Sequence, residues 1–272
     1  MQAISPNETI RLGIVLLDLP HLSPEFGSFG PDDSTGLGGL PPGWFECPAS
    51  WPIPTTYAVA SGAGAAATLG GKDAAIRGVA GAVSRLAESS DLIIGDCGFF
   101  WAARDRAVFS AGPPVLLSGL ELLELAGRGT ESDVAVITFS APALERLLAK
   151  HPMRPRLRFV GLSDMPSWSH LAAEDYGLSP GWSTEQLGTE LTQRLTERLA
   201  DGSLDGVGSI VVECTVVPQF RAALRELTRL PILDLREVAL GFLLGSRQAV
   251  PTASTVATPV RNSKERTLDV KR

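Results

Sequence analysis

Two cysteines that close short apolar runs are the residues in this sequence best suited to chemistry. Cys97 ends the run Leu-Ile-Ile-Gly-Asp-Cys, and Cys214 ends the run Ser-Ile-Val-Val-Glu-Cys. Runs of this kind predict buried strands, so each strand would deliver a thiol at its carboxyl end. A thiol acts as an acid or a base once its surroundings set its pKa. Thiols on opposite sides of a carbon atom would invert a stereocentre without a cofactor, because one removes a proton and the other supplies one.

The spacing around these cysteines indicates an internal duplication. Pro114 lies 17 residues after Cys97, and Pro231 lies 17 residues after Cys214. Each proline opens a short predicted strand that leads into a helix. Two similar halves commonly pack about a pseudo-twofold axis, and ligands of parallel sheets bind beyond the carboxyl ends of the strands. Facing halves would therefore place the two thiols on opposite walls of one cleft.

The order of the remaining elements defines the expected fold. Strands alternate with amphipathic helices, which predicts an α/β protein with two similar Rossmann-like or flavodoxin-like lobes and mostly parallel sheets. We expect a helix after a cap at Asp73 and another over 101–110, which follows Cys97. Two more helices are expected after caps at Ser140 and Ser183. Leucines at 187, 191, 195 and 199 form a core-facing stripe. We expect 163–182 to be irregular and 248–272 to be a disordered tail.

Residues next to the cysteines are expected to tune and position them. Thr215 is predicted to cap a following helix, and helix N-termini after both cysteines would stabilise thiolates. Strand alternation would place Asp96 and Glu213 on the opposite face from the thiols. Backbone N–H groups and hydroxyl groups at strand ends, such as those of Thr138, Ser140 and Thr215, are candidates to hold a substrate carboxylate.

Bulk composition limits the class of partner. The chain has 272 residues, 44% of them hydrophobic, and a formal net charge of −6. An acidic chain without a basic block before its last dozen residues is not expected to bind nucleic acid or an anionic membrane, so a small molecule is the expected partner. No signal peptide or membrane span is predicted, which favours the cytoplasm. Three cysteines in a chain this long are expected to be reduced.

The motifs Asp96-Cys97-Gly98-Phe99, Glu213-Cys214-Thr215 with Pro218, and Pro231-Ile-Leu-Asp234 resemble those of the aspartate/glutamate racemase superfamily. That superfamily is independent of pyridoxal phosphate and includes hydantoin racemases, maleate isomerases and arylmalonate decarboxylases. The resemblance implies two cysteine acid/bases, no cofactor, substrate contacts from Thr215 and the 138–140 turn, and a homodimer. It also implies a split into lobe 1 (1–117 plus 233–247) and lobe 2 (118–232).

Two departures from the superfamily pattern bear on the substrate. Gly98-Phe99 replaces the Asn-Thr that usually follows the first cysteine, and Val216 replaces the histidine that glutamate racemases carry. With Gly98 and Phe99 at the substrate, we expect a small carboxylate or amino-acid derivative with an apolar or ring substituent. The function predicted is racemisation, epimerisation or isomerisation by Cys97 and Cys214.

Several alternatives stay open at this point. Decarboxylation or a maleate-isomerase-like reaction would use mainly one cysteine, and a non-catalytic ligand-binding protein would use neither. A lone cysteine after a strand is ordinarily core packing, which is the interpretation given to Cys47. Asp18, which aligns with Ser140, would line the cleft or be an ordinary loop carboxylate. Gly62-x-Gly64 fits a dinucleotide-binding fingerprint only loosely, no metal site is predicted, and the long 21–56 segment is a candidate lid or pocket wall.

Overall fold

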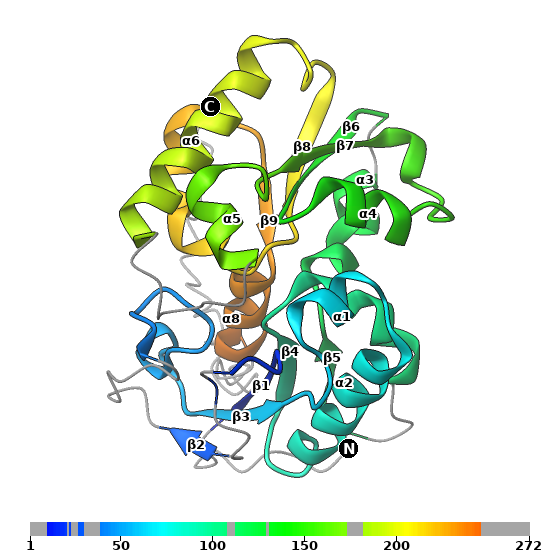
Figure 1. The fold of residues 1–272 in the computed structure, drawn as a ribbon, viewed down its shortest axis with the longest axis vertical. Coiled ribbons are helices and arrows are strands. Elements are labelled where there is room, and N and C mark those ends of the chain that lie inside the picture. The colour runs from blue at the N-terminus through cyan, green and yellow to red at the C-terminus, as the bar shows by residue number, and fades with distance from the viewer. Residues whose placement is uncertain are drawn as a thin grey trace, which may run out of the picture.

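Two sheets with flanking helices make up the chain in the computed structural model, which describes residues 10–20, 22, 27–29, 39–107, 112–128, 131–172 and 182–245. Figure 1 shows one sheet above the other. The first sheet has the order β2-β3-β1-β4-β5, formed by Gly27–Phe29, Thr55–Val59, Leu12–Leu16, Leu92–Gly95 and Val115–Leu116. Its strands are parallel except β2, which is a short antiparallel edge strand.

The second sheet repeats the parallel part of the first. Its order is β7-β6-β8-β9, formed by Leu157–Gly161, Asp133–Thr138, Val207–Val212 and Ile232–Asp234, and every pair is parallel. When the edge strand β2 is left out, both sheets have the same order. From one edge to the other, the strand that comes second in the sequence is followed by the first, the third and the fourth. This shared order confirms the α/β class and the mostly parallel sheets predicted from the sequence, and it supports the duplication.

Helices bury the apolar faces of both sheets. On the first sheet α2 (Asp73–Leu86) packs against β1 and β3, after the short α1 (Ala65–Leu69). The second sheet is flanked by helices whose bounds are Leu123–Gly127 (α3), Ala141–Leu147 (α4), Pro166–Ala172 (α5), Thr184–Ala200 (α6) and Arg221–Leu227 (α7). Short 3₁₀ helices cover Pro48–Ser50, Gly98–Arg106 (η3), Gly119–Leu122 (η4), Arg154–Arg156 and Val217–Phe220 (η6). Among the described residues, no helix combines the length and apolar character needed to cross a membrane.

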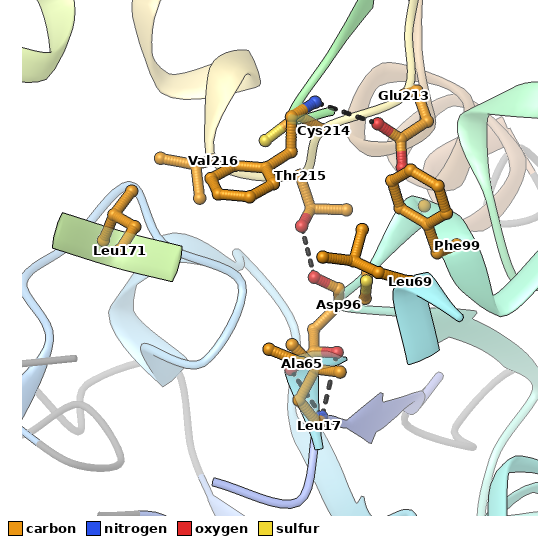
Figure 2. A pocket seen from close by; sticks show the side chains of 13 residues that line it. Leu17, Ala65, Leu69, Asp96, Phe99, Leu171, Glu213, Cys214, Thr215 and Val216 are labelled. Carbon is orange, nitrogen blue, oxygen red and sulfur yellow. Dashed lines mark hydrogen bonds between the residues drawn. The ribbon is translucent and has the colours of Figure 1, made fainter. Parts of the chain in front are cut away.

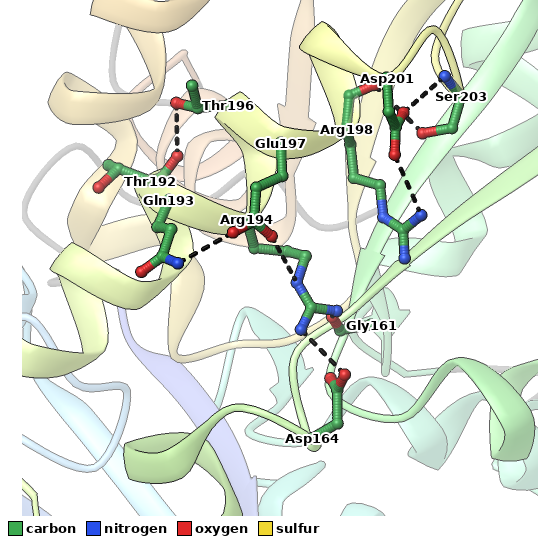
Figure 3. Close-up of polar contacts among 10 residues, drawn as sticks. All are labelled: Gly161, Asp164, Thr192, Gln193, Arg194, Thr196, Glu197, Arg198, Asp201 and Ser203. Carbon is green, nitrogen blue, oxygen red and sulfur yellow. Dashed lines mark hydrogen bonds and ion pairs between the residues drawn. The ribbon is translucent and has the colours of Figure 1, made fainter.

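The helix α6 is held to the sheet by an arginine. Arg194 donates hydrogen bonds to the Gly161 carbonyl (3.0 Å), at the end of β7, and to the Asp164 carboxylate (2.9 Å), as Figure 3 shows. The predicted leucine stripe lies beneath it, with Leu187, Leu191 and Leu195 fully buried. Burial of this stripe confirms the amphipathic pattern read from the sequence.

The last helix joins the two sheets. β9 pairs with β8 of the second sheet, whereas α8 (Leu235–Gly245) buries Leu235, Ala239 and Leu243 in the core of the first sheet. In Figure 1 α8 runs from the end of β9 toward β4. The chain therefore passes from the second sheet to the first core where β9 ends and α8 begins, which couples the positions of the two sheets.

An aromatic segment, residues 39–54, also bridges the two cores. Trp44 packs in the second core, with its ring 5.4 Å from that of Trp182, while Phe45 packs in the first core. Arg236 of α8 donates to the carbonyl groups of Gly43 (3.4 Å) and Ser50 (2.5 Å). This part of the 21–56 segment is a buried wall between the sheets, and residues 21, 23–26 and 30–38 lie outside the described residues.

Local structure corrects several helix predictions. Asp73 is the first residue of α2 and makes no capping hydrogen bond. The helix predicted over 101–110 is a 3₁₀ helix that starts at Gly98, directly after Cys97. α5 forms within the stretch expected to be irregular, because Trp168 and Leu171 find burial there. Ser140 and Ser183 do cap α4 and α6, and the predicted tail at 248–272 lies outside the described residues.

Gly119 permits a close backbone approach that a methyl group would block. A Cβ atom there would lie 2.1 Å from the carbonyl oxygen of Val212, the last residue of β8. We therefore expect Gly119→Ala to lower the free energy of unfolding by about 1–3 kcal/mol, measured by urea denaturation.

The matched control is Gly241→Ala in α8, where a Cβ atom meets nothing within 4 Å. Alanine is the better helix former, so this variant should be more stable by about 0.5–1 kcal/mol. Equal stability changes in the two alanine variants would contradict the packing argument.

Candidate active site at the ends of two strands

One small cavity receives residues from the carboxyl ends of both sheets. Cys97 follows β4 by two residues, and Cys214 follows β8 by two residues. Parallel strands present such ends at a common edge of the sheet, which is where α/β proteins bind ligands. The cavity has a volume of about 50 Å³, enough for a few water molecules. It is lined by Leu17, Ala65, Leu69, Asp96, Cys97, Gly98, Phe99, Phe139, Leu171, Glu213, Cys214, Thr215 and Val216 (Figure 2).

Both thiols are held neutral by their surroundings. Burial raises the pKa of Cys97 well above its ordinary value, and the carboxyls of Glu213 and Asp96 raise it further. Burial is also the largest effect that raises the pKa of Cys214, and the charge of Glu213 raises it further. Backbone N–H groups of Phe99 for Cys97, and of Val216 and Val217 for Cys214, oppose these shifts. The expected N–H groups are thus present, but desolvation outweighs them.

Asp96 and Glu213 face the cavity together with the thiols, which corrects the expectation that they point away from them. Alternation between faces holds within a strand. β4 ends at Gly95 and β8 ends at Val212, so both acids lie where the chain has already left the strand. Both oxygens of Asp96 accept from the Leu17 N–H, at 3.1 and 3.0 Å. Burial, and then the charge of Glu46, raise the pKa of Asp96.

Glu213 reaches from the second sheet to the loop of Cys97. Its Oε2 accepts hydrogen bonds from the Thr138 hydroxyl (2.7 Å) and the Phe139 N–H (3.3 Å). A Cβ atom on Gly98 would lie 2.2 Å from its Oε1, so only glycine leaves room for this carboxyl. Burial raises the pKa of Glu213 to about 7, with the bonds from Thr138 and Phe139 acting in the opposite direction.

The remaining predicted site residues occupy different places. Gly98, Phe99 and Thr215 line the cavity with the two cysteines, whereas Thr138, Ser140 and Asp18 are not among its lining residues. The Thr215 hydroxyl donates to the backbone carbonyl of Asp96, joining the two strand ends, and makes no helix cap. The Ser140 hydroxyl accepts from the Ala143 N–H (3.4 Å), and the Asp18 carboxylate accepts from the Gly62 N–H (2.7 Å).

Glu46 is a buried acid that sequence reasoning missed. It lies in the aromatic bridging segment, is 6% exposed, and burial raises its pKa to about 7. Its charge also raises the pKa values of Asp96 and Cys214. A single charged residue inside the run Trp-Phe-Glu-Cys was the available signal. Leu17 and Phe139 could have been found as residues just after strands, whereas Ala65, Leu69 and Leu171 reach the cavity only through helix packing.

The cavity lining contains acids but no cation. None of its residues is Lys, Arg or His. Within the part of the chain that the structure describes, no group of three or more His, Cys, Asp and Glu residues is arranged to hold a metal ion. Charge in this site is therefore controlled by protons, which both carboxyls and both thiols can hold.

Known proteins similar to this chain are enzymes, at low sequence identity. No protein-family model matches it. Dimethylsulfoniopropionate lyases 6 and 3 of Emiliania huxleyi (strain CCMP1516) are 27% and 26% identical to it over 153 residues. Each match covers 52% of this chain and 39% of the relative, so the chain matches under half the length of these curated relatives.

Three solved structures give the same kind of comparison. Allantoin racemase from Klebsiella pneumoniae has a TM-score of 0.47 and 14% identity, with 87% of this chain and 89% of that chain covered. Picrophilus torridus aspartate racemase has a TM-score of 0.45 and 11% identity, covering 88% and 94%. Unliganded arylmalonate decarboxylase has a TM-score of 0.41 and 14% identity, covering 89% and 94%.

The buried carboxyls make stability depend on pH. Glu213 binds its proton more tightly in the folded chain, with a pKa of about 7 against an ordinary value of 4.5. The free energy of unfolding should therefore fall as pH rises from about 4.5 to about 7, and then level off. Glu213→Gln should remove a part of this fall on the order of 3 kcal/mol, measured by urea denaturation across the range. An unchanged pH dependence in the variant would show that Glu213 titrates normally.

Proposed function

We propose that this protein is a cofactor-independent enzyme that moves a proton at a carbon atom of a small carboxylate or amino-acid derivative, as a racemase, epimerase or isomerase. One observation carries the proposal: matching strand ends of two sheets with the same parallel order each deliver a cysteine to one cavity. Inversion at carbon needs an acid and a base from different sides. Cys97 and Cys214 are the pair that would supply them.

The surroundings of the thiols define the starting state of the reaction. In the free protein both cysteines are neutral, because burial and neighbouring carboxyls oppose ionisation. The reaction needs one thiolate, which takes the proton from the substrate carbon while the other thiol donates its proton to the opposite face. The N–H group of Phe99, or those of Val216 and Val217, would stabilise the thiolate as it forms. Once Asp96 and Glu213 are protonated, they no longer repel that charge.

A lyase reaction is the second candidate, favoured by the similarity to dimethylsulfoniopropionate lyases and by a cavity that has acids and no cation. A sulfonium group would favour ionisation of the buried acids, and the carboxylates formed would attract it. One thiolate would take the proton next to the carboxylate, the electron pair of that C–H bond would form a double bond, and the C–S bond would break. Dimethyl sulfide would leave with the electron pair of the broken bond, and acrylate would remain. Only one cysteine is needed for this outcome.

Deuterium exchange tests both candidates. A panel of small chiral carboxylates and dimethylsulfoniopropionate, incubated with the protein in deuterated water, should show deuterium entering one substrate at the carbon beside the carboxylate, detected by NMR. For a racemase, Cys97→Ser and Cys214→Ser should each slow racemisation by about 10²–10⁴-fold. For a lyase, one substitution should stop elimination and the other should affect it less.

The control is Cys47→Ser, because Cys47 is buried outside the cavity and should leave turnover unchanged. Racemisation at the full rate in both site variants would reject the role of the thiols. A ligand that binds without any exchange would point instead to a non-catalytic binding protein.

A further inference from the structure

The described residues offer a ligand in the cavity no help from a basic side chain. Its lining has no Lys, Arg or His. Among the described residues, a ligand carboxylate in this cavity would therefore be matched by hydrogen-bond donors that are neutral.

The neutral hydroxyl donors near the cavity are already in use. Thr138 gives its hydroxyl hydrogen to Glu213, and Thr215 gives its own to the backbone carbonyl of Asp96. Binding a carboxylate through either hydroxyl would break a buried hydrogen bond. Apart from backbone N–H groups, the hydrogens left for a ligand are those on the acids that line the cavity.

Among these acids, Glu213 is the one with an oxygen left over. Its Oε2 is held by Thr138 and Phe139, and no hydrogen bond to Oε1 is made by any described residue. Asp96 differs, since both of its oxygens accept from the Leu17 N–H. Oε1 packs against Gly98, the residue after Cys97, and Glu213 lines the same cavity as the two thiols.

We propose that Glu213 binds the carboxylate of the ligand as a neutral carboxylic acid, donating a hydrogen bond from Oε1, so that ligand binding is coupled to proton uptake. The inference deepens the proposed function, on which it rests, by naming the group that recognises a small monocarboxylate. It uses no oxidant or other reactant: a proton from solvent joins Oε1 and the carboxylate accepts the resulting hydrogen bond.

No titratable group among the described lining residues carries a positive charge that would oppose this protonated state. Cys97, Cys214 and Asp96 share the cavity with it, and the charge of Glu46 acts on Asp96 and Cys214. All four are acids, so none offers a positive charge that would keep Glu213 ionised. The negative charge of a bound carboxylate would further disfavour the ionised form of Glu213.

Propionate is the probe, with propionamide as its uncharged counterpart, and saturation-transfer NMR measures the dissociation constants. If only neutral Glu213 binds, a pKa of about 7 predicts about tenfold weaker propionate binding at pH 8 than at pH 6. Propionamide binding should not change between these pH values. In Glu213→Gln the amide supplies the donor at any pH, so propionate should bind with less than a twofold change.

Two further variants separate recognition from a structural effect. Thr138→Val removes a hydrogen bond that lowers the pKa of Glu213, so the pH at which propionate binding weakens should move upward. Glu121→Gln is the matched control, since burial raises the pKa of Glu121 too but it caps a helix outside the cavity. The tenfold pH effect should persist in that control.

Three results would overturn the inference: no propionate binding at pH 6, equal binding of propionate at pH 6 and pH 8, or an unchanged tenfold effect in Glu213→Gln. These measurements need no turnover, so they are independent of the exchange experiments. Proton-linked binding in a protein that exchanges no substrate proton would reject the racemase and lyase proposals and leave the role of Glu213 standing.

Discussion

Burial of acidic groups with no cation beside them among the described residues is the constraint on which this site depends. Asp96, Glu213 and Glu46 are each at most 6% exposed, and two cysteines share their surroundings. Taking a carboxylate or a thiolate out of water costs free energy, and each additional negative charge raises that cost. The folded protein meets this cost by keeping protons, and the carboxyls of Glu213 and Glu46, whose pKa values burial raises to about 7, gain or lose them near neutral pH. Such groups are suited to exchanging protons with a substrate.

The acids can be buried because the two strand ends are joined directly. Thr215 donates across the junction to the backbone of Asp96, Glu213 packs against Gly98, and Gly119 packs against the end of β8. α8 and the aromatic bridging segment fix the two cores relative to each other from the other side. Glycines at 98 and 119 are required because side chains there would separate the sheets. The cavity is therefore a product of the contact between two units, and neither sheet encloses it alone.

The same junction explains why the two thiols are similar but not equivalent. Duplication provides each with an apolar strand, a preceding acid and a following 3₁₀ helix. Their surroundings then differ, since two N–H groups favour the thiolate of Cys214 and one favours that of Cys97. Glu213 repels both thiolates, while Asp96 acts on Cys97 and Glu46 acts on Cys214. This difference is what would allow one thiol to serve as base and the other as acid.

The sequence by itself determined the order of the elements along the chain and some of their residues. These are the alternating strands and helices, a cysteine just after each of two buried strands, and the leucine stripe of α6. These features are local, because hydrophobic period and capping residues act within a few positions of each other. Which face Asp96 and Glu213 present, which hydroxyl groups are already bonded, and how Glu46 reaches the acids were decided only by tertiary structure. Each depends on contacts between residues far apart in the chain, such as Thr138 with Glu213 and Asp96 with Thr215. Strand alternation ceases to apply once a strand ends, so the side chains that follow take the direction that packing and desolvation allow.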